Sequence, residues 1–249
     1  MDKKQDDGVL EAKLFDAVRL AQSSPRFVGF LDERQAVFAQ KLMEHIPFKN
    51  YMLWGGYDGS ERVVFGAFPD FQQPDASAFP LVPITALFRS VDVLSHRDFL
   101  GALLANGIVR ETIGDILVEE GRCVIFVRGE ISDFVLSQTV KIGRAGVKLS
   151  QGASEPLPQR SSFEAFSAVV ASARLDCMVS AALGTSREKA SDMIRAGLVM
   201  LNHEINTSVS ALVAQGGKLS VRGKGRFIVD RIGPQTKKGR LCVAGRKYI

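Results

Sequence analysis

Arginine and lysine side chains are concentrated in the last third of this 249-residue sequence, and their chemistry suits phosphate groups. Residues 174–249 hold 14 basic and 5 acidic side chains, a net charge of +9, whereas residues 1–173 hold 18 basic and 22 acidic ones, a net charge of −4. A guanidinium group is planar and can donate two parallel hydrogen bonds to one phosphate. The segregation favours a polyanionic partner for the C-terminal third, with a solvated basic surface as the alternative.

Two arginines, Arg174 and Arg187, are our first choice as phosphate ligands because each lies near the start of a predicted short helix. The pair Thr185 and Glu188 predicts a capping box that opens the second helix. The N-terminus of that helix adds backbone donors near Ser186. The further candidate RNA ligands are Lys189, Arg195, Asn202, Lys218, Arg222, Lys224 and Arg226.

The segment Leu219–Ile232 is predicted to be one long strand. Alternate residues of a strand share a face, so Arg222, Lys224 and Arg226 would form a row of cations. The two glycines between them suggest a bulge or a close backbone approach. The sequence thus predicts one cationic surface built from two short helices and this strand.

Residues that could support catalysis or hold a metal are scattered. They are Cys123, Cys177, Cys242, His45, His96 and His203. An odd number of distant cysteines without a Cys-x-x-Cys pair argues against a disulfide framework and a structural zinc site. The glycine-rich segment 55–59 lacks the Gly-Lys-Ser/Thr of a phosphate loop and is better explained as a turn. We therefore expect no catalytic residue, no metal and no cofactor.

The first fifty residues are predicted to be helical. Apolar residues at helical spacing indicate one helix over residues 10–21, and Asp32 with Gln35 indicates a capping pair that begins a second. Aromatic and β-branched runs at Tyr51–Trp54 and Arg62–Phe68 then predict a hairpin around a turn-rich segment. A proline-rich loop is expected from Pro69 to Pro83.

The middle of the chain is predicted to follow the order β-α-β-β-α-β. The expected elements are Ile84–Arg89, His96–Asn106, Asp115–Glu119, Cys123–Arg128, Ile131–Ile142 and Val147–Ser150. This order is typical of a ferredoxin-like sandwich, the fold of RNA-recognition motifs. The third strand lacks the paired aromatics with which such modules stack bases, so we interpret this domain as scaffold first and RNA binder second.

The predicted fold class is α+β, with an N-terminal domain of helices and a β-hairpin over residues 1–78, the middle domain over 79–160 and a C-terminal domain over 161–249. Residues 151–162 have the composition of a linker. Phe163–Ser172 fits either a strand or the start of a helix.

The C-terminal motif resembles the S4 RNA-binding domain. The resemblance is carried by Arg174-Leu175-Asp176, by Ser186-Arg187 with Ala190, and by Ile194, Gly197, Val199 and Asn202. One departure is Gly217-Lys218, where family members often carry Gly-Asp, and it puts the geometry of that turn in doubt. The resemblance implies a fold of the αL type that docks on structured RNA.

The whole chain resembles the YlmH family. The similar segments are Phe30-Leu31-Asp32, Gly55-Gly56-Tyr57 with Glu61-Arg62, Ser172 with Arg174-Leu175-Asp176, and residues 222–227. Membership would imply a three-part bacterial cytosolic factor that binds the large ribosomal subunit. Related S4 proteins act on stalled subunits that retain a tRNA-linked nascent chain, and the family is linked to that rescue and, by genetic context, to cell division.

These inferences predict a non-catalytic, cytoplasmic protein that docks on ribosomal RNA, or on tRNA, of the large ribosomal subunit. No apolar run approaches the roughly 18 residues of a membrane span, and residues 1–7 lead into no apolar signal core. Two alternatives stay open. One is an RNA-modifying enzyme of the pseudouridine synthase type, whose catalytic Arg-Leu-Asp is echoed by residues 174–176; the other is a cell-division interaction scaffold that uses the acidic N-terminal part. The oligomeric state is left open.

Overall fold

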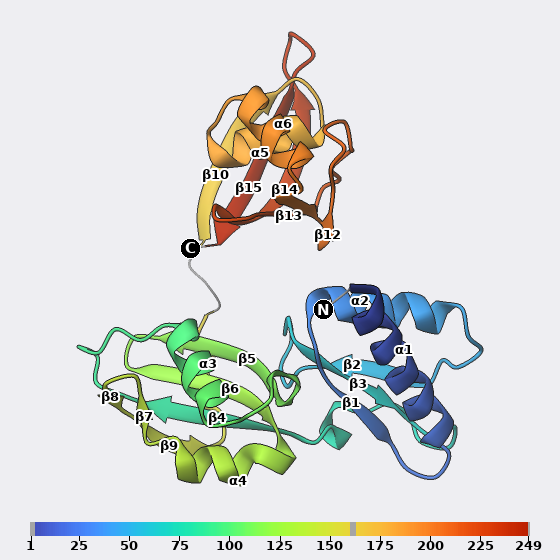
Figure 1. The fold of residues 1–249 in the computed structure, drawn as a ribbon, viewed down its shortest axis with the longest axis vertical. Coiled ribbons are helices and arrows are strands. Elements are labelled where there is room, and N and C mark those ends of the chain that lie inside the picture. Colours follow the sequence, from blue (N-terminus) through green and yellow to red (C-terminus); the bar gives the residue numbers. More distant parts are fainter. Residues whose placement is uncertain (1–2, 160–162, 249) are drawn as a thin grey trace. The chain divides into compact units, whose positions relative to one another are not determined.

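The computed structural model describes residues 3–159 and 163–248, which form two compact units, residues 1–160 and 161–249 (Figure 1). It contains α-helices and sheets in which all the described strand pairs are antiparallel. The mixed helix-and-sheet class that the sequence predicts is confirmed. Each unit has its own hydrophobic core and is described separately.

The first unit begins with two helices packed on a three-stranded sheet of order β1-β3-β2. The elements are α1 (Lys3–Leu20), β1 (Arg26–Leu31), α2 (Glu33–Glu44), β2 (Tyr51–Trp54) and β3 (Val63–Ala67). The prediction of an all-helical start is wrong at β1. This aromatic and β-branched segment pairs with β3 and buries Phe30 and Leu31, which a solvent-facing connection between helices could not do.

Two local predictions in this region are confirmed. Asp32 and Gln35 form the capping box of α2: the Asp32 carboxylate accepts from the Gln35 amide at 2.8 Å, and the Asp32 amide donates to the Gln35 side chain at 2.9 Å. The hairpin also forms, because β2 and β3 pair antiparallel from Tyr51 opposite Ala67 to Trp54 opposite Val64.

The rest of this unit follows the predicted β-α-β-β-α-β order, with an added small hairpin. The elements are β4 (Leu81–Leu87), α3 (His96–Ala105), β5 (Ile113–Glu119), β6 (Arg122–Arg128), α4 (Gly129–Gln138), β7 (Lys141–Ile142), β8 (Ala145–Gly146) and β9 (Lys148–Gln151), with short 3-10 turns at Ala76–Ala78 and Arg110–Thr112. The sheet order is β5-β6-β4-β9, and α3 and α4 share a core with one face of it. The second helix ends four residues earlier than predicted, because residues 141–146 turn back as the β7–β8 hairpin.

The other face of this sheet is covered by the N-terminal sheet. A single buried cluster joins Phe30, Val64 and Phe68 of the first sheet region to Val124 and Phe126 of β6. The predicted linker is also partly ordered here: Arg122 donates to the carbonyls of Ser154 at 2.8 Å and Pro156 at 2.6 Å. Its residues 160–162 lie outside the described part.

The segment Gly55-Gly56-Tyr57 forms the junction between these two sheets. The Tyr57 ring stacks on Phe126 with centroids 4.9 Å apart, and its hydroxyl donates to the buried Asp115 carboxylate at 2.9 Å. A Cβ on Gly56 would lie 2.4 Å from the Phe126 ring, and Gly56 has a φ of +103°. The motif is therefore structural, since only glycine allows the sheets to approach this closely.

We expect Gly56→Ala to destabilise the first unit by about 2–3 kcal/mol, from overpacking against Phe126 together with backbone strain. The control is Gly59→Ala, which has a similar φ of +82° but open space around its Cβ and should cost less. Urea unfolding followed through the single tryptophan, Trp54, measures both, because Trp54 packs against the same cluster. Equal destabilisation by the two variants would contradict the assigned close approach.

The C-terminal unit is a six-stranded sheet with two short helices on one face (Figure 1). The elements are β10 (Phe163–Val170), α5 (Leu175–Leu183), α6 (Arg187–Arg195), β11 (Val199–Leu201), β12 (Glu204–Ile205), β13 (Lys218–Val221), β14 (Gly225–Gln235) and β15 (Leu241–Tyr248), in the order β10-β15-β14-β13-β11-β12. Of the two readings left open for Phe163–Ser172, the strand is correct. Gly197 is left-handed with a φ of +68° just after α6, a conformation that favours glycine at the end of a helix.

The predicted long strand Leu219–Ile232 is wrong. The chain reverses at Arg222-Gly223-Lys224, so that β13 and β14 form a hairpin in which Val221 lies opposite Gly225. The Lys224 amide donates to the Val221 carbonyl at 2.9 Å, and Gly223 takes a φ of +74°. A glycine in this conformation suits the third position of a tight turn, so the two glycines mark a reversal of the chain and not a bulge within one strand.

Candidate nucleic-acid interface

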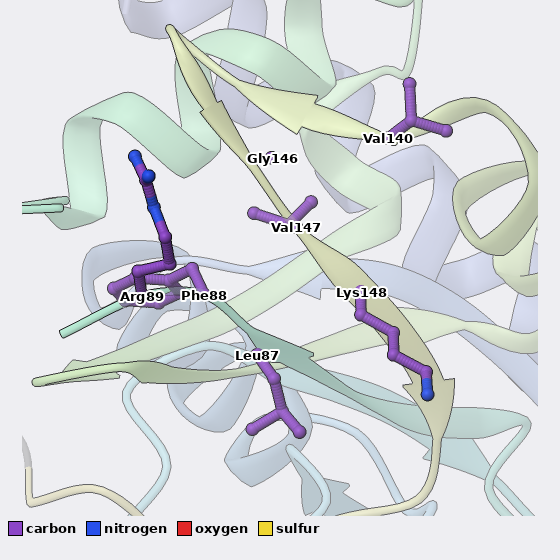
Figure 2. A pocket seen from close by; sticks show the side chains of 7 residues that line it. All are labelled: Leu87, Phe88, Arg89, Val140, Gly146, Val147 and Lys148. Carbon is purple, nitrogen blue, oxygen red and sulfur yellow. The ribbon is translucent and has the colours of Figure 1, made fainter.

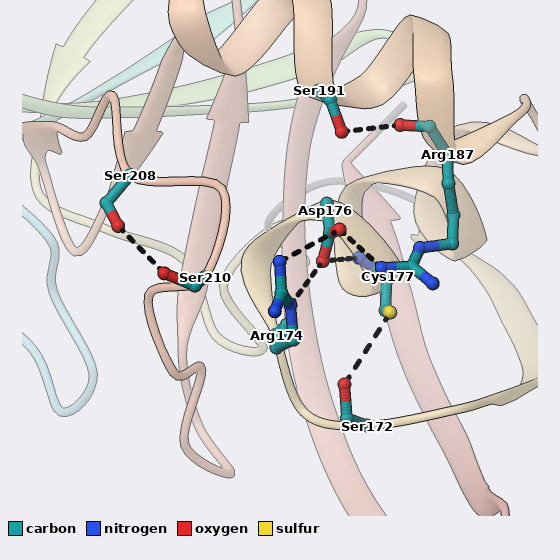
Figure 3. A network of polar contacts seen from close by, with 8 residues as sticks. All are labelled: Ser172, Arg174, Asp176, Cys177, Arg187, Ser191, Ser208 and Ser210. Carbon is teal, nitrogen blue, oxygen red and sulfur yellow. Dashed lines mark hydrogen bonds and ion pairs between the residues drawn. The ribbon is translucent and has the colours of Figure 1, made fainter.

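The two arginines chosen first as phosphate ligands meet at one buried carboxylate (Figure 3). Asp176, in the first turn of α5, accepts from Arg187 Nη2 at 2.6 Å and from Arg174 Nε at 3.2 Å. Its Oδ1 also accepts from the Cys177 amide at 2.9 Å. Arg174 caps α5 and Arg187 begins α6, so the helix starts place both side chains. We call Arg174, Asp176 and Arg187 the Asp176 cluster.

This geometry differs from the predicted outward projection, because both guanidinium groups turn toward an acid. The side chains nevertheless stay accessible: Arg174 is 39% exposed and Arg187 is 54% exposed, whereas Asp176 is 5% exposed. One carboxylate balances only one of the two positive charges. The cluster therefore keeps a net positive charge and holds two guanidinium planes in fixed positions, an arrangement suited to phosphate.

The charge state of Asp176 follows from competing effects. Burial raises the pKa of its carboxyl, but hydrogen bonds from Arg187 and Arg174 outweigh burial and leave the pKa below its ordinary value. The hydrogen bond to Asp176 in turn raises the pKa of Arg187. Asp176 and Arg187 are thus both ionised at neutral pH.

Because the pKa of Asp176 is lowered on folding, its stabilisation is complete above the unfolded-state pKa of about 4 and is lost as the pH falls through the folded value. We expect Asp176→Asn to cost about 2 kcal/mol at neutral pH. The difference in stability between this variant and the unsubstituted chain should become smaller as the pH falls below about 4. Hydrogen exchange of α5 amides, compared at neutral and acidic pH, measures it. A difference that does not change with pH would show that the carboxylate charge is not what stabilises α5.

The remaining candidates on α6 have local roles as well. The Ser186 hydroxyl caps the helix by accepting from the Lys189 amide at 3.3 Å, so the cap is Ser186 and not the predicted Thr185. Arg195 lies 3.6 Å from Asp192 and is 65% exposed. The Lys189 side chain is exposed on the same helix. Lys189 and Arg195 thus extend the positive surface of α6.

Asn202 and Lys218 meet through backbone contacts that are structural. The Asn202 side chain accepts from the Lys218 amide at 3.0 Å, and the Asn202 amide donates to the Lys218 carbonyl at 2.8 Å. Asn202 and His203 both have positive φ, +48° and +70°, and form the two-residue turn between β11 and β12. This turn gives Asn202 a role in folding.

The prediction of one continuous cationic surface is wrong. Arg222 and Lys224 lie in the exposed β13–β14 turn, while Lys218 and Arg226 lie in the strands. Their neighbours Leu219 and Phe227 point into the core beneath α5 and α6. Strand residues alternate between faces, so Lys218 and Arg226 lie on the face of the sheet opposite the helices.

The first unit has one feature that sequence reasoning missed. A shallow recess of about 430 Å³ lies at the end of β4 beside β9 (Figure 2). It is lined by Leu87, Phe88, Arg89, Val140, Gly146, Val147 and Lys148. Arg89 is held by Asp92 through two hydrogen bonds of 2.8 and 2.9 Å, and Lys148 is exposed. Residues 87–93 are largely apolar and hold one arginine and one aspartate, which gives no specific sequence signal for this site.

The described residues contain neither a metal site nor a membrane-spanning helix. Within residues 3–159 and 163–248, no group of three or more His, Cys, Asp or Glu side chains is placed to hold a metal ion. Over the same ranges, the helices are too short or too polar to cross a membrane.

Comparison with known proteins adds a family and a fold. A family model described as "Putative RNA-binding domain in YlmH" matches residues 87–155. The chain is 32% identical over 223 residues to the ribosome-associated protein quality control protein P2 of Bacillus subtilis (strain 168), which covers 88% of this chain and 85% of that protein. The structure of this chain is similar to that of the cell division protein ylmH from Streptococcus pneumoniae, with a TM-score of 0.53 and 22% sequence identity. The match covers 61% of this chain and 93% of that one.

These matches define the class as a mixed helix-and-sheet protein that carries the domain described for YlmH proteins. The match to the Bacillus subtilis protein extends over most of both sequences. The chain belongs to the YlmH family, which confirms the resemblance inferred from its motifs.

Proposed function

We propose that this chain is a non-catalytic cytoplasmic protein that docks on ribosomal RNA of the large subunit, with tRNA as a second contact, during rescue of stalled ribosomes. The name of the Bacillus subtilis relative refers to ribosome-associated quality control, and the matching family model is described as RNA-binding. The observation that carries the proposal is the Asp176 cluster, two accessible arginines fixed at the starts of α5 and α6.

The proposed contact is with the backbone of an RNA helix. Double-stranded RNA hides its base edges in a deep groove, so proteins bind mainly its phosphates and 2′-hydroxyls. Arg174 and Arg187 would each meet a phosphate, and the first amides of α6 would add donors. Lys189, Arg195 and the turn residues Arg222 and Lys224 would attract the backbone at longer range.

The proposed domain organisation has three parts. Residues 1–78 form the N-terminal domain, 79–160 an RNA-recognition-motif-like domain and 161–249 an S4 domain. The strand order β5-β6-β4-β9 supports the second, since a ferredoxin-like sandwich orders its strands this way. The two short helices that begin at the Arg174 and Ser186 motifs support the third.

The middle domain needs a different RNA surface from that of a typical RNA-recognition motif. Its helix-free sheet face packs Val124 and Phe126 against the N-terminal sheet and cannot stack bases. The exposed edge at β9, with Arg89 and Lys148 beside the recess, is the surface that we propose for RNA. The sequence alone predicts a scaffold first and an RNA binder second, and the description of the family model favours the reverse order.

Sedimentation of the full chain with purified large or small ribosomal subunits tests the proposal. We expect pelleting with large subunits, reduced by Arg187→Ala and retained by Arg19→Ala, an exposed arginine in an ion pair with Asp16 on α1. Equal pelleting with small subunits would contradict the choice of subunit. Tritium release from labelled uridine in ribosomal RNA would contradict the non-catalytic assignment.

A second candidate function, a cell-division interaction scaffold, is favoured by the name of the Streptococcus pneumoniae structure. The acidic residues 1–173, with a net charge of −4, would supply its surface. Deleting residues 1–160 separates the two functions. A truncated chain that still binds ribosomes but does not restore division in cells lacking the protein would support the scaffold.

A further inference from the structure

The C-terminal sheet has a second basic face that is not part of the proposed docking surface. Residues that lie directly opposite one another in antiparallel strands point to the same side. Ile228 lies opposite both Lys218 and Arg246, Ser220 lies opposite Arg226, and Tyr248 lies opposite Phe163. The helices α5 and α6 pack on the other side, over Leu219 and Phe227. We call Lys218, Arg226, Arg246, Phe163 and Tyr248 the open sheet face.

Two guanidinium groups lie over two aromatic rings on this face. The Arg226 Cζ atom is 4.7 Å from the centre of the Tyr248 ring, and the Arg246 Cζ atom is 4.8 Å from that of Phe163. The two rings contact each other, with centroids 5.0 Å apart at 61°. Four planar groups from β10, β14 and β15 thus lie in contact, with the two rings edge to face, and we call this group the platform.

The platform is held in place and remains accessible. Asp230 accepts from Arg246 Nε and Nη2 in a bidentate pair, both at 2.8 Å, which fixes that guanidinium group. Phe163 is 38% exposed and the Arg246 side chain 45% exposed.

This face carries three basic side chains on neighbouring strands. Lys218, Arg226 and Arg246 lie on β13, β14 and β15, and Arg246 is paired with Asp230. Lys218 and Arg226 lie diagonally across the β13–β14 pair, and burial together with the nearby Arg226 lowers the pKa of Lys218. A phosphate group between Lys218 and Arg226 would relieve their mutual repulsion.

From this combination we propose that the open sheet face binds unpaired nucleotides of single-stranded RNA. The bases would stack on the aromatic and guanidinium planes, and the phosphates would contact Lys218 and Arg226. Stacking of this kind tolerates any base, because every base has a π face. A duplex is excluded as the ligand, since its bases are already stacked on one another. This site lies on the opposite face from the Asp176 cluster and does not depend on it.

Fluorescence anisotropy of the full chain with two probes, a labelled ten-nucleotide oligouridine and a labelled RNA hairpin, tests the inference. Tyr248→Leu should weaken oligouridine binding about 10-fold, the effect of losing one stacked base, and leave hairpin binding within about twofold. Tyr248→Phe keeps the ring and should bind oligouridine as the unsubstituted chain does. Lys218→Gln, which removes a charge without touching the rings, should also weaken oligouridine binding.

The outcomes separate this inference from the proposed function. Loss of hairpin binding in Arg187→Ala, with oligouridine binding unchanged, is expected if the two sites are independent. Unchanged oligouridine affinity in both Tyr248→Leu and Lys218→Gln would overturn the open-face site. So would an equal loss for both probes in Lys218→Gln. If the chain binds oligouridine but binds neither the hairpin nor ribosomal subunits, the proposed function is contradicted and the open-face site is supported.

Discussion

Removing both arginines of the Asp176 cluster is expected to weaken binding to large-subunit RNA about 100-fold at constant salt. Each charge-assisted hydrogen bond to a phosphate contributes roughly 1.5 kcal/mol, and two such losses correspond to about two powers of ten. The variant Arg174→Ala/Arg187→Ala should also carry Asp176→Asn, because a buried carboxylate without partners would destabilise α5 by itself. Filter binding with isolated ribosomal RNA measures the affinity.

Two controls distinguish phosphate recognition from a general loss of charge. Arg187→Lys retains the charge but loses the planar fork, so its affinity should lie between those of the unsubstituted chain and the Ala variant. The salt dependence should also become shallower by about two phosphate contacts in the triple variant. If the triple variant binds as tightly as the unsubstituted chain and keeps its salt slope, these arginines do not contact phosphate.

Replacing Asp115 is expected to have the largest effect on stability, about 3–5 kcal/mol for Asp115→Ala. This buried carboxylate accepts from the Tyr57 hydroxyl and from the amides of Glu61 and Arg62, at 2.9 to 3.2 Å. Arg62 itself donates to the carbonyls of Phe30, Ile113 and Arg110. Burial, together with the nearby Arg110, lowers the pKa of Arg62 to about 10, so it is still charged at neutral pH, and the acids Asp32, Asp115 and Glu111 favour that charge.

Urea unfolding followed through Trp54 fluorescence measures that effect, because Trp54 packs at the same junction. Asp115→Asn keeps an acceptor of the same shape and should cost less. Asp16→Ala, which removes a 63% exposed carboxylate from the pair with Arg19, should change the free energy of unfolding by less than about 1 kcal/mol. Similar values for Asp115→Ala and Asp16→Ala would refute the role of the buried network.

Features set by short-range geometry could be predicted from the sequence. The capping box at Asp32 and Gln35, the glycine turn after α6 at Gly197 and the turn at Asn202-His203 each depend on a few adjacent residues. The β-α-β-β-α-β order was predictable because strand and helix periodicities differ, although boundaries moved by several residues where apolar residues continued past an element.

Features set by long-range contacts could not be predicted. Strand β1 is defined by pairing with β3, more than thirty residues away in the sequence. Asp176 and Arg187 lie 11 residues apart, and only the packing of α5 against α6 brings them to 2.6 Å. The sequence predicts these arginines as phosphate ligands, but it does not show that both pair with one buried carboxylate.

The prediction of one continuous cationic surface is wrong because of a single turn. Strand alternation would place the cations of residues 222–226 on one face, but the left-handed Gly223 reverses the chain there. The reversal separates Arg222 and Lys224, which lie in the turn, from Arg226, which lies in β14. The pairing of β14 with β13 shows on which face of the sheet Arg226 lies. Phe163 and Arg246 were missed because nothing in their local sequence shows that β10 and β15 are neighbours.

Crosslinking of RNA to the full chain in cells, followed by sequencing, tests the central claim most directly. The account predicts that crosslinked reads concentrate in ribosomal RNA of the large subunit and fall sharply when Arg174 and Arg187 are replaced. Reads spread over messenger RNA, or a large-subunit pattern that survives the loss of both arginines, would contradict it.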